Sequence, residues 1–155
     1  MGYAYLNKAA RTGGSGTQVF VAMWFNDEVN EIFTTAIEPA VRESGFTACR
    51  IDKVEHNNKV DDEIIKEIRK SKFVIADFTS GFIGEDRNKT LIARGGVYYE
   101  AGFAHGLGIP VIWTCRNDCI DFLHFDTRRY NHIVWKTPEE LKEKLINRIG
   151  ATITP

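Results

Sequence analysis

Apolar residues along this chain occur in two alternating patterns: short compact runs, and longer stretches in which they recur at helical spacing. The compact runs predict buried strands, and the periodic stretches predict helices with one apolar face. We expect strands at residues 18–23, 46–51, 73–77, 110–114 and 132–135. We expect helices at residues 28–44, 61–71 and 138–149, and a further helix that contains Glu100.

The alternation of strands and helices predicts the fold. Strands joined through helices lie parallel in one sheet, with helices on both of its faces. Because such crossovers are right-handed, we expect a flavodoxin-like α/β three-layer sandwich with a five-stranded parallel sheet. Within the helix at 28–44, Pro39 is expected to kink or divide the helix, and Gly45 is expected to end it.

The first residues of the chain differ in composition from the rest. A short aromatic piece, Gly2–Leu6, is followed by a glycine-rich and serine-containing stretch at 11–16, which has linker composition. We expect residues 1–16 to be an appendage or linker, and one interpretation is that they end an upstream domain. Residues 17–155 then form the α/β domain.

Composition narrows the class of protein. A length of 155 residues predicts one domain, and 43% apolar with 26% charged residues is typical of a globular protein. The 20 basic and 21 acidic residues are well mixed, which argues against binding nucleic acid or an anionic membrane by bulk charge. Three cysteines, no apolar run of membrane-spanning length and no signal-peptide core predict a cytoplasmic location.

The most informative segment is Gly95–Gly106, in which Glu100 follows a glycine pair. We expect Glu100 in the first turn of a helix, beside the end of the strand at 73–77. Ligands bind at such strand ends in open α/β sheets, and a carboxylate among aromatic residues suits attack on, or stabilisation of, a sugar cation. The alternative is a glutamate that merely favours a helix N-terminus. The small residues Ala101, Gly102, Ala104 and Gly106 predict that this helix packs closely on the sheet or on another helix.

Other strand ends also carry candidate ligands. Trp24 and Phe25 follow the first strand and either wall a pocket for a nucleobase or cap the core. Asp77 is a candidate to bond a ribose hydroxyl, to orient a loop or to form a turn. Arg116 is a candidate clamp for a phosphate or carboxylate. The cysteines and histidines lack the spacing of metal ligands, and no phosphate-binding glycine motif is present, so no metal or cofactor is expected.

Several segments together resemble a known family. They are Val19–Phe25, Ile37–Ala40, Arg50–Asp52, Ile75–Thr79, Val97–Ile112 and His124–Asp126, in that order. The chain thereby resembles the nucleoside 2-deoxyribosyltransferase-like family, a relative of TIR-type nucleotide-processing domains, over about residues 18–148. The run Tyr99-Glu100-x-Gly102-x-Ala104 is the most specific part. The resemblance implies a flavodoxin-like fold, cleavage of an N-glycosidic bond and, as is usual in the family, a homo-oligomer.

The resemblance also implies roles for individual residues. Glu100 would be the nucleophile that attacks the anomeric carbon, and water or another base would resolve the glycosyl-enzyme. Residues of the first strand end would hold the base, Asp52 and Asp77 would contact the ribose, and the segment before the last strand would complete a neighbouring subunit's site. The candidate substrate contacts are Met23, Trp24, Phe25, Asp52, Asp77, Thr79, Arg94, Gly96, Tyr99, Arg116 and Asp126.

Two positions depart from the transferases of the family. Arg94 stands where they carry an acid that helps to hold the base, and Ile64 stands where they carry an aspartate. The departures favour a hydrolase, and Arg94 with Arg116 favours an anionic substrate. We therefore expect an N-glycosidase acting on a nucleotide or nucleoside. The alternatives are a base-exchanging transferase, an NAD-cleaving TIR-like effector domain, a nucleotide-sensing module without turnover, and a structural domain whose pocket has decayed.

Overall fold

A computed structural model of the chain describes residues 14, 16–51, 60–80 and 94–153. Its strands form one parallel sheet in the order β2-β1-β3-β4-β5. They are β1 (Gln18–Ala22), β2 (Thr47–Cys49), β3 (Phe73–Asp77), β4 (Val111–Arg116) and β5 (Ile133–Trp135). The helical segments are α2 (Asp27–Ile32), η1 (Phe33–Ile37), α3 (Glu38–Glu43), α4 (Val60–Lys70), α5 (Gly95–Gly106), η2 (Asn117–Phe122) and α6 (Pro138–Thr152). The predicted flavodoxin-like α/β fold is confirmed.

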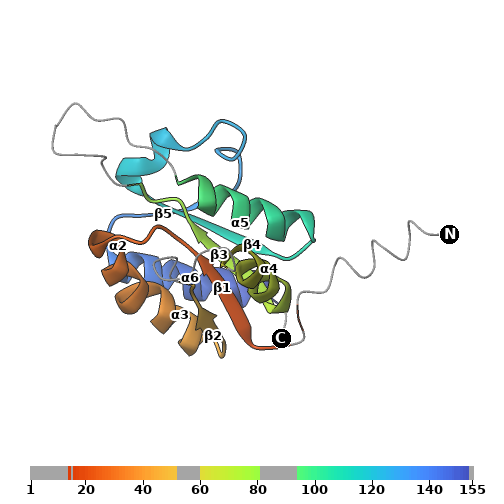
Figure 1. The fold of residues 1–155 in the computed structure, drawn as a ribbon. Coiled ribbons are helices and arrows are strands. Elements are labelled where there is room, and N and C mark those ends of the chain that lie inside the picture. Colours follow the sequence, from red (N-terminus) through yellow and green to blue (C-terminus); the bar gives the residue numbers. More distant parts are fainter. Residues whose placement is uncertain (1–13, 15, 52–59, 81–93, 154–155) are drawn as a thin grey trace.

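Helices cover both faces of the sheet (Figure 1). Helices α4 and α5 lie on one face, and the α2–η1–α3 segment lies with α6 on the other. Alternate side chains of β1 pack on opposite faces of the sheet. Val19 and Val21 belong to the cluster under α6, whereas Phe20 and Ala22 belong to the cluster under α4 and α5. Because both faces are covered, the strands read as continuous apolar runs rather than as alternating ones.

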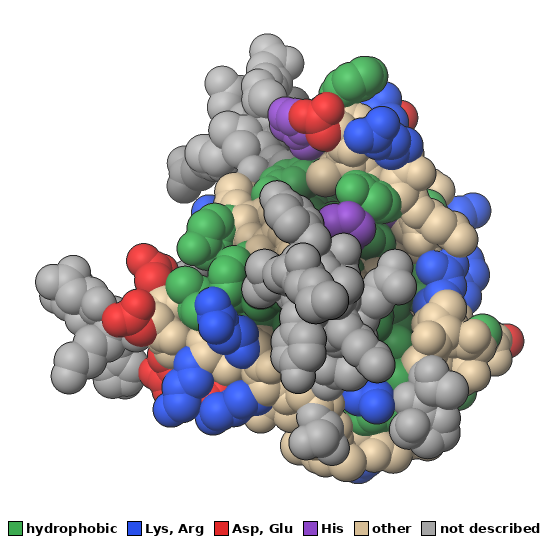
Figure 2. All heavy atoms as spheres, turned by 90° about the vertical axis from the view of Figure 1, so that its right-hand side faces the viewer, with side chains coloured by type: hydrophobic (Ala, Val, Ile, Leu, Met, Phe, Trp, Pro, Cys, Tyr) green, Lys and Arg blue, Asp and Glu red, His purple; other side chains and the backbone are tan. Residues whose placement is uncertain are grey.

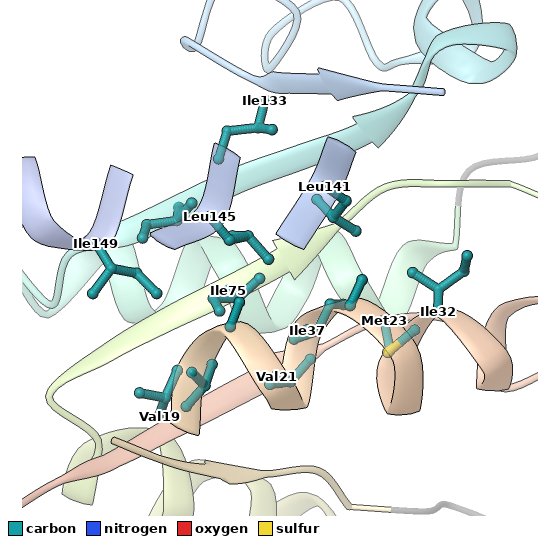
Figure 3. Packing of buried hydrophobic residues seen from close by; sticks show 14 of the residues in the cluster. Val19, Val21, Met23, Ile32, Ile37, Ile75, Ile133, Leu141, Leu145 and Ile149 are labelled. Carbon is teal, nitrogen blue, oxygen red and sulfur yellow. The ribbon is translucent and has the colours of Figure 1, made fainter. Parts of the chain in front are cut away.

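The core under α6 joins the strands to two helical segments. Figure 3 shows Val21 and Ile75 of the sheet facing Ile37 of η1 and Leu145 of α6. All four side chains are buried, with at most 1% of their surface exposed. This layer holds the end of β1, where Met23 also packs into the cluster, in a fixed position.

The helix predicted at residues 28–44 is present but changes its winding before Pro39. Residues Phe33–Ile37 form a π-helical section, closed by the Glu38 N–H donating to the Phe33 carbonyl. Proline cannot donate a backbone hydrogen bond, and its ring would clash with the carbonyl four residues earlier in a regular helix. The wider turn relieves both constraints, so the expected interruption takes the form of a π-bulge.

Two glycines with positive φ end the helices beside the sheet. Gly45 (φ 85°) follows α3, and the Phe46 N–H donates to the Val41 carbonyl across it. Gly108 (φ 75°) follows α5, where Ile109 N–H donates to Ala104 in the same way. This closure needs a left-handed residue, which glycine adopts without steric cost. The prediction that Gly45 ends the helix is confirmed.

Strand β5 forms one edge of the sheet, and side chains from α6 cap its backbone. The Lys144 Nζ donates to the Val134 carbonyl at 2.7 Å, and Arg148 donates to the Asn131 carbonyl at 3.1 Å. Edge carbonyls left unpaired are a template for pairing with another strand. Both charged side chains therefore block the backbone of this edge.

Three sequence predictions remain expectations. The appendage at residues 1–16 falls mostly outside the described residues, of which only Gly14 and Gly16 belong to it. The described helices include none that is both long and apolar enough to cross a membrane. The cytoplasmic location and the domain boundary at residue 17 therefore stay predictions.

Candidate active site

A pocket of about 360 Å³ opens at the carboxyl edge of the sheet. Its lining residues come from the end of β1 and from the start of α5: Met23, Trp24, Phe25, Arg94, Gly95, Gly96, Val97 and Glu100. Strands β1 and β3 are neighbours here, and the chain connections run in opposite directions from this point. Flavodoxin-like sheets bind their ligands at this switch point.

Glu100 reaches the pocket from the second turn of α5. The helix begins at Gly95, directly after the extended Arg94, and has no acidic residue in its first turn. The prediction that Glu100 lies in the first turn is therefore wrong, because the glycine pair itself starts the helix. Its side chain is only 5% exposed although it lines the pocket. The favourable effect of a helix N-terminus on an acid fades beyond the first turn, so that effect does not account for a buried Glu100.

The small residues of α5 divide between two environments. Ala101 and Ala104 are fully buried against the sheet, on the same side as Val97 and Glu100. Gly102 and Gly106 are exposed, and a Cβ added at either would meet no atom within 4 Å. The prediction of close packing is thus confirmed for the alanines and wrong for the glycines, which face open space.

Aromatic rings and guanidinium groups lie together at the pocket and beside it. The Arg94 Cζ lies 4.3 Å from the ring centroid of Trp24. Arg50 stacks on Phe25 at 4.9 Å and on Phe33 at 4.4 Å. Trp24 also packs against the core cluster, so it caps the core and walls the pocket at the same time. Each guanidinium lies over an aromatic face, a favourable cation–π arrangement.

Asp77 does not line the pocket. It is 1% exposed, and its Oδ1 accepts a hydrogen bond from the Thr79 N–H at 3.1 Å. Its Oδ2 accepts hydrogen bonds from the Thr114 hydroxyl and from the Trp135 Nε1–H, the latter at 3.3 Å. Burial raises the pKa of this carboxyl, opposed by these hydrogen bonds. Asp77 therefore forms the turn expected as one alternative and ties together the ends of β3, β4 and β5.

The other polar residue predicted at this strand end also bonds within the protein. Thr79 is 3% exposed, and its Oγ1 accepts a hydrogen bond from the Arg116 backbone N–H at 3.1 Å. The Arg116 guanidinium donates two hydrogen bonds to Asp118, at 2.7 and 3.1 Å, which lowers the pKa of that acid. Neither Thr79 nor Arg116 is among the residues that line the pocket.

Three further predicted contacts lie away from the pocket or outside the described residues. Tyr99 is 58% exposed and stacks on Phe103, with ring centroids 6.5 Å apart. Asp126 lies on the exposed loop before β5, with its carboxylate 3.4 Å from the His124 ring. Asp52 falls outside the described residues. Their roles stay predictions.

The structure adds pocket residues that the sequence had not indicated. Gly95 and Val97 line the pocket because the helix starts earlier than expected. Arg50, directly after β2, packs on the ring of Phe25, which lines the pocket. Val97 and Arg50 carried a signal, since both belong to the family-like segments. Among the described residues, no group of three histidine, cysteine or acidic side chains is arranged to hold a metal ion. Burial raises the pKa of both Cys115 and Cys119, which makes these thiols poor nucleophiles.

Comparison with known proteins gives matches in structure and not in sequence. No family model and no curated protein matches the sequence. The Clostridium botulinum CMP N-glycosidase BcmB superposes with a TM-score of 0.57 at 17% identity, covering 83% of this chain and 97% of that one. The 2-desoxiribosyltransferase from Leishmania mexicana gives 0.58 at 13% identity, covering 84% and 97%.

The chain shares its fold with these two enzymes. The likeness extends over nearly the whole length of both enzymes, and it confirms the resemblance drawn from the sequence segments at the level of the fold. At these identities the match concerns backbone architecture, so the chemistry has to be argued from the pocket itself.

Proposed function

We propose that this protein cleaves the N-glycosidic bond of a nucleotide or nucleoside, with Glu100 as the catalytic carboxylate. The observation that carries the proposal is the position of Glu100: a carboxylate 5% exposed, yet on the wall of a pocket at the β1/β3 switch point. The fold shared with an N-glycosidase and a deoxyribosyltransferase supports the same reaction type.

In the proposed mechanism, a Glu100 oxygen attacks the anomeric carbon of the sugar. The bond from that carbon to the base nitrogen breaks, its electron pair leaves with the base, and the base takes a proton from the solvent. The resulting glycosyl-enzyme is then hydrolysed by water, which releases the sugar and restores the carboxylate. Two displacements at one carbon follow the logic of retaining glycosidases, in which a carboxylate stabilises an oxocarbenium-like transition state.

The pocket walls support a nucleotide as the substrate. Trp24 and Phe25 supply aromatic contacts for a base, and Arg94 supplies a positive charge where the transferases carry an acid. Arg116 is less available for this purpose, because Asp118 already takes two hydrogen bonds from it. The structural neighbour BcmB acts on CMP, a nucleotide. The replacement of the acid by Arg94 supports hydrolysis rather than transfer between bases.

Arg94 also favours one alternative substrate. Its cation suits the diphosphate of a dinucleotide, so cleavage of NAD by a TIR-like effector domain is the second candidate function. A nucleotide-sensing module would use the same pocket and would have no need of a nucleophile.

We further propose that the protein is a homo-oligomer in which the loop before β5 reaches a neighbouring subunit. Phe125 on that loop is 86% exposed, beside the predicted contact Asp126, and Phe122 is 44% exposed. Exposed apolar side chains close to one another in the chain, at the end of η2 and on the loop after it, are typical of association surfaces.

The test is product analysis by chromatography. The purified protein is incubated with NAD, with nucleoside monophosphates and with deoxynucleosides, beside Glu100→Gln and the control Glu143→Gln. Glu143 is an exposed acid of α6, so its substitution removes the same charge away from the pocket. Release of a free base by the wild type and by Glu143→Gln, but not by Glu100→Gln, supports the glycosidase and names its substrate class.

Two results would contradict the proposal. Saturable binding of a nucleotide by the wild type and Glu100→Gln, without base release by either, would favour the sensing module. Equal base release by both proteins would show that Glu100 is not the catalytic carboxylate.

A further inference from the structure

A second pocket, of about 530 Å³, lies at the amino edge of the sheet, opposite the candidate active site. It is bounded by the residues before β1, the turn between α3 and β2, the start of β3 and the last turns of α6. Its lining residues are Gly16, Thr17, Ser44, Gly45, Phe46, Lys72, Ile146, Ile149, Gly150 and Ile153. Its volume is within the range of small-molecule sites, which is about 300–1,000 Å³.

Apolar side chains and glycines give this pocket its form. Ile146, Ile149 and Ile153 follow one side of α6, and Phe46 faces them from the turn before β2. Gly150 is exposed, and a Cβ added there would meet no atom within 4 Å. Glycine is a poor helix former, and its presence in α6 leaves the wall hollow where any larger residue would begin to fill the space.

One charged side chain stands at this apolar pocket. Lys72 is the single ionisable residue among those that line it, and its side chain is half-buried. Among the described residues, no carboxylate forms an ion pair with its ammonium group. Figure 2 views the molecule from the right-hand side of Figure 1 and shows both hydrophobic and Lys or Arg side chains on that face. A partly buried cation beside an apolar surface favours a ligand that supplies the missing negative charge.

We propose that this pocket binds an amphipathic anion, namely an apolar chain or ring system that carries one carboxylate or sulfonate group. The anionic head pairs with Lys72, and the apolar body lies against Ile146, Ile149 and Ile153. The pocket and the candidate active site lie at opposite edges of the sheet, so both can be occupied together. The proposal does not depend on the function proposed for Glu100.

Binding of two probe anions to the full chain tests the proposal. Anilinonaphthalene sulfonate is followed by fluorescence, and decanoate by calorimetry, with decanol as the neutral control. We expect one site per chain, at least about tenfold weaker binding of decanol than of decanoate, and no competition from nucleotides. Lys72→Met should weaken the binding of both anions about tenfold and leave decanol unchanged, because it keeps the apolar stem. Gly150→Leu should abolish binding of all three while the thermal unfolding transition is kept.

Three outcomes would overturn the proposal. Equal affinity of wild type, Lys72→Met and Gly150→Leu would place the anions elsewhere on the molecule. Binding that occurs only after removal of residues 1–13 would assign the pocket to that segment of the chain. Failure to bind, together with a concentration-dependent doubling of mass that Gly150→Leu abolishes, would assign it to a second copy.

Discussion

Two buried acids lie near the carboxyl edge of the sheet, and their surroundings differ. Asp77 is 1% exposed and accepts hydrogen bonds from Thr79, Thr114 and Trp135, which fix the ends of three strands. Glu100 is 5% exposed but lines the pocket beside Trp24. Both positions satisfy the sequence rule that ligands bind at strand ends. That rule says nothing about access to a pocket. Access distinguishes Glu100, which is placed for chemistry, from Asp77, which holds the strand ends together.

The largest expected effect is on catalysis. Glu100→Gln keeps the shape of the side chain but removes the nucleophile, so base release should fall by roughly 10³-fold or more, about 4 kcal/mol of transition-state stabilisation. Asp77→Asn should change the same rate by less than about tenfold. The rates are compared under saturating substrate at one temperature. Equal losses in the two variants would break the distinction between the two acids.

The next effect is on stability, and here the substitution of Asp77 is expected to have the larger effect of the two. Asp77→Ala leaves the indole N–H of Trp135 and the Thr79 N–H without their buried acceptor, which should lower the free energy of unfolding by roughly 2–5 kcal/mol. Glu100→Gln should change it by less than about 1 kcal/mol. Urea unfolding followed by tryptophan fluorescence measures both. A larger loss for Glu100→Gln would show that Glu100 serves the framework.

The pH dependence of stability tests the role of Asp77. Burial raises its pKa in the folded protein above the unfolded value of about 3.9. The folded state then holds the proton more tightly, so the contribution of Asp77 is full below about pH 4 and is lost as the pH rises through the raised pKa. The stability of the wild type relative to Asp77→Asn should therefore fall as the pH is raised from about 4. A difference that stays constant or grows as the pH is raised would contradict the assignment.

The smallest effect concerns the outer side of the helix that carries Glu100. Gly102 faces open space, so Gly102→Ala should stabilise the protein by about 0.5–1 kcal/mol through helix propensity alone. Base release should stay unchanged, since Ala101 and Glu100 keep their places on the inner side. Thermal unfolding measures the gain. A loss of stability would show that another part of the molecule, or another copy, covers this side of α5.

The fold could be predicted from the sequence because both faces of the sheet are covered. Each buried strand then appears as a compact apolar run, and each helix repeats its apolar positions every three or four residues. Pro39 indicated a break in the first helix, but not that a π-helical section would precede it. That detail depends on how the backbone accommodates the proline ring, which a propensity does not encode.

The candidate site could be predicted in part. Trp24, Phe25 and Glu100 were found because strand ends and helix starts meet at the switch point. Arg50 over two aromatic rings and the donors to Asp77 from Thr114 and Trp135 were not, because both arrangements join segments far apart in the sequence. Such contacts follow from packing in three dimensions, and only the assembled sheet brings them together.

The capped edge of β5 limits how copies of this protein can assemble. An incoming strand would have to displace Lys144 and Arg148 from the carbonyls of Val134 and Asn131 before it could pair there. Copies joined at this edge into one continuous sheet would have to bury two cations or expel them. An oligomer that uses this side of the molecule is therefore expected to form through helices or loops, without joining the sheets at β5. Neutralising Lys144, for example by acetylation, would remove one of the two barriers and make strand exchange between molecules easier.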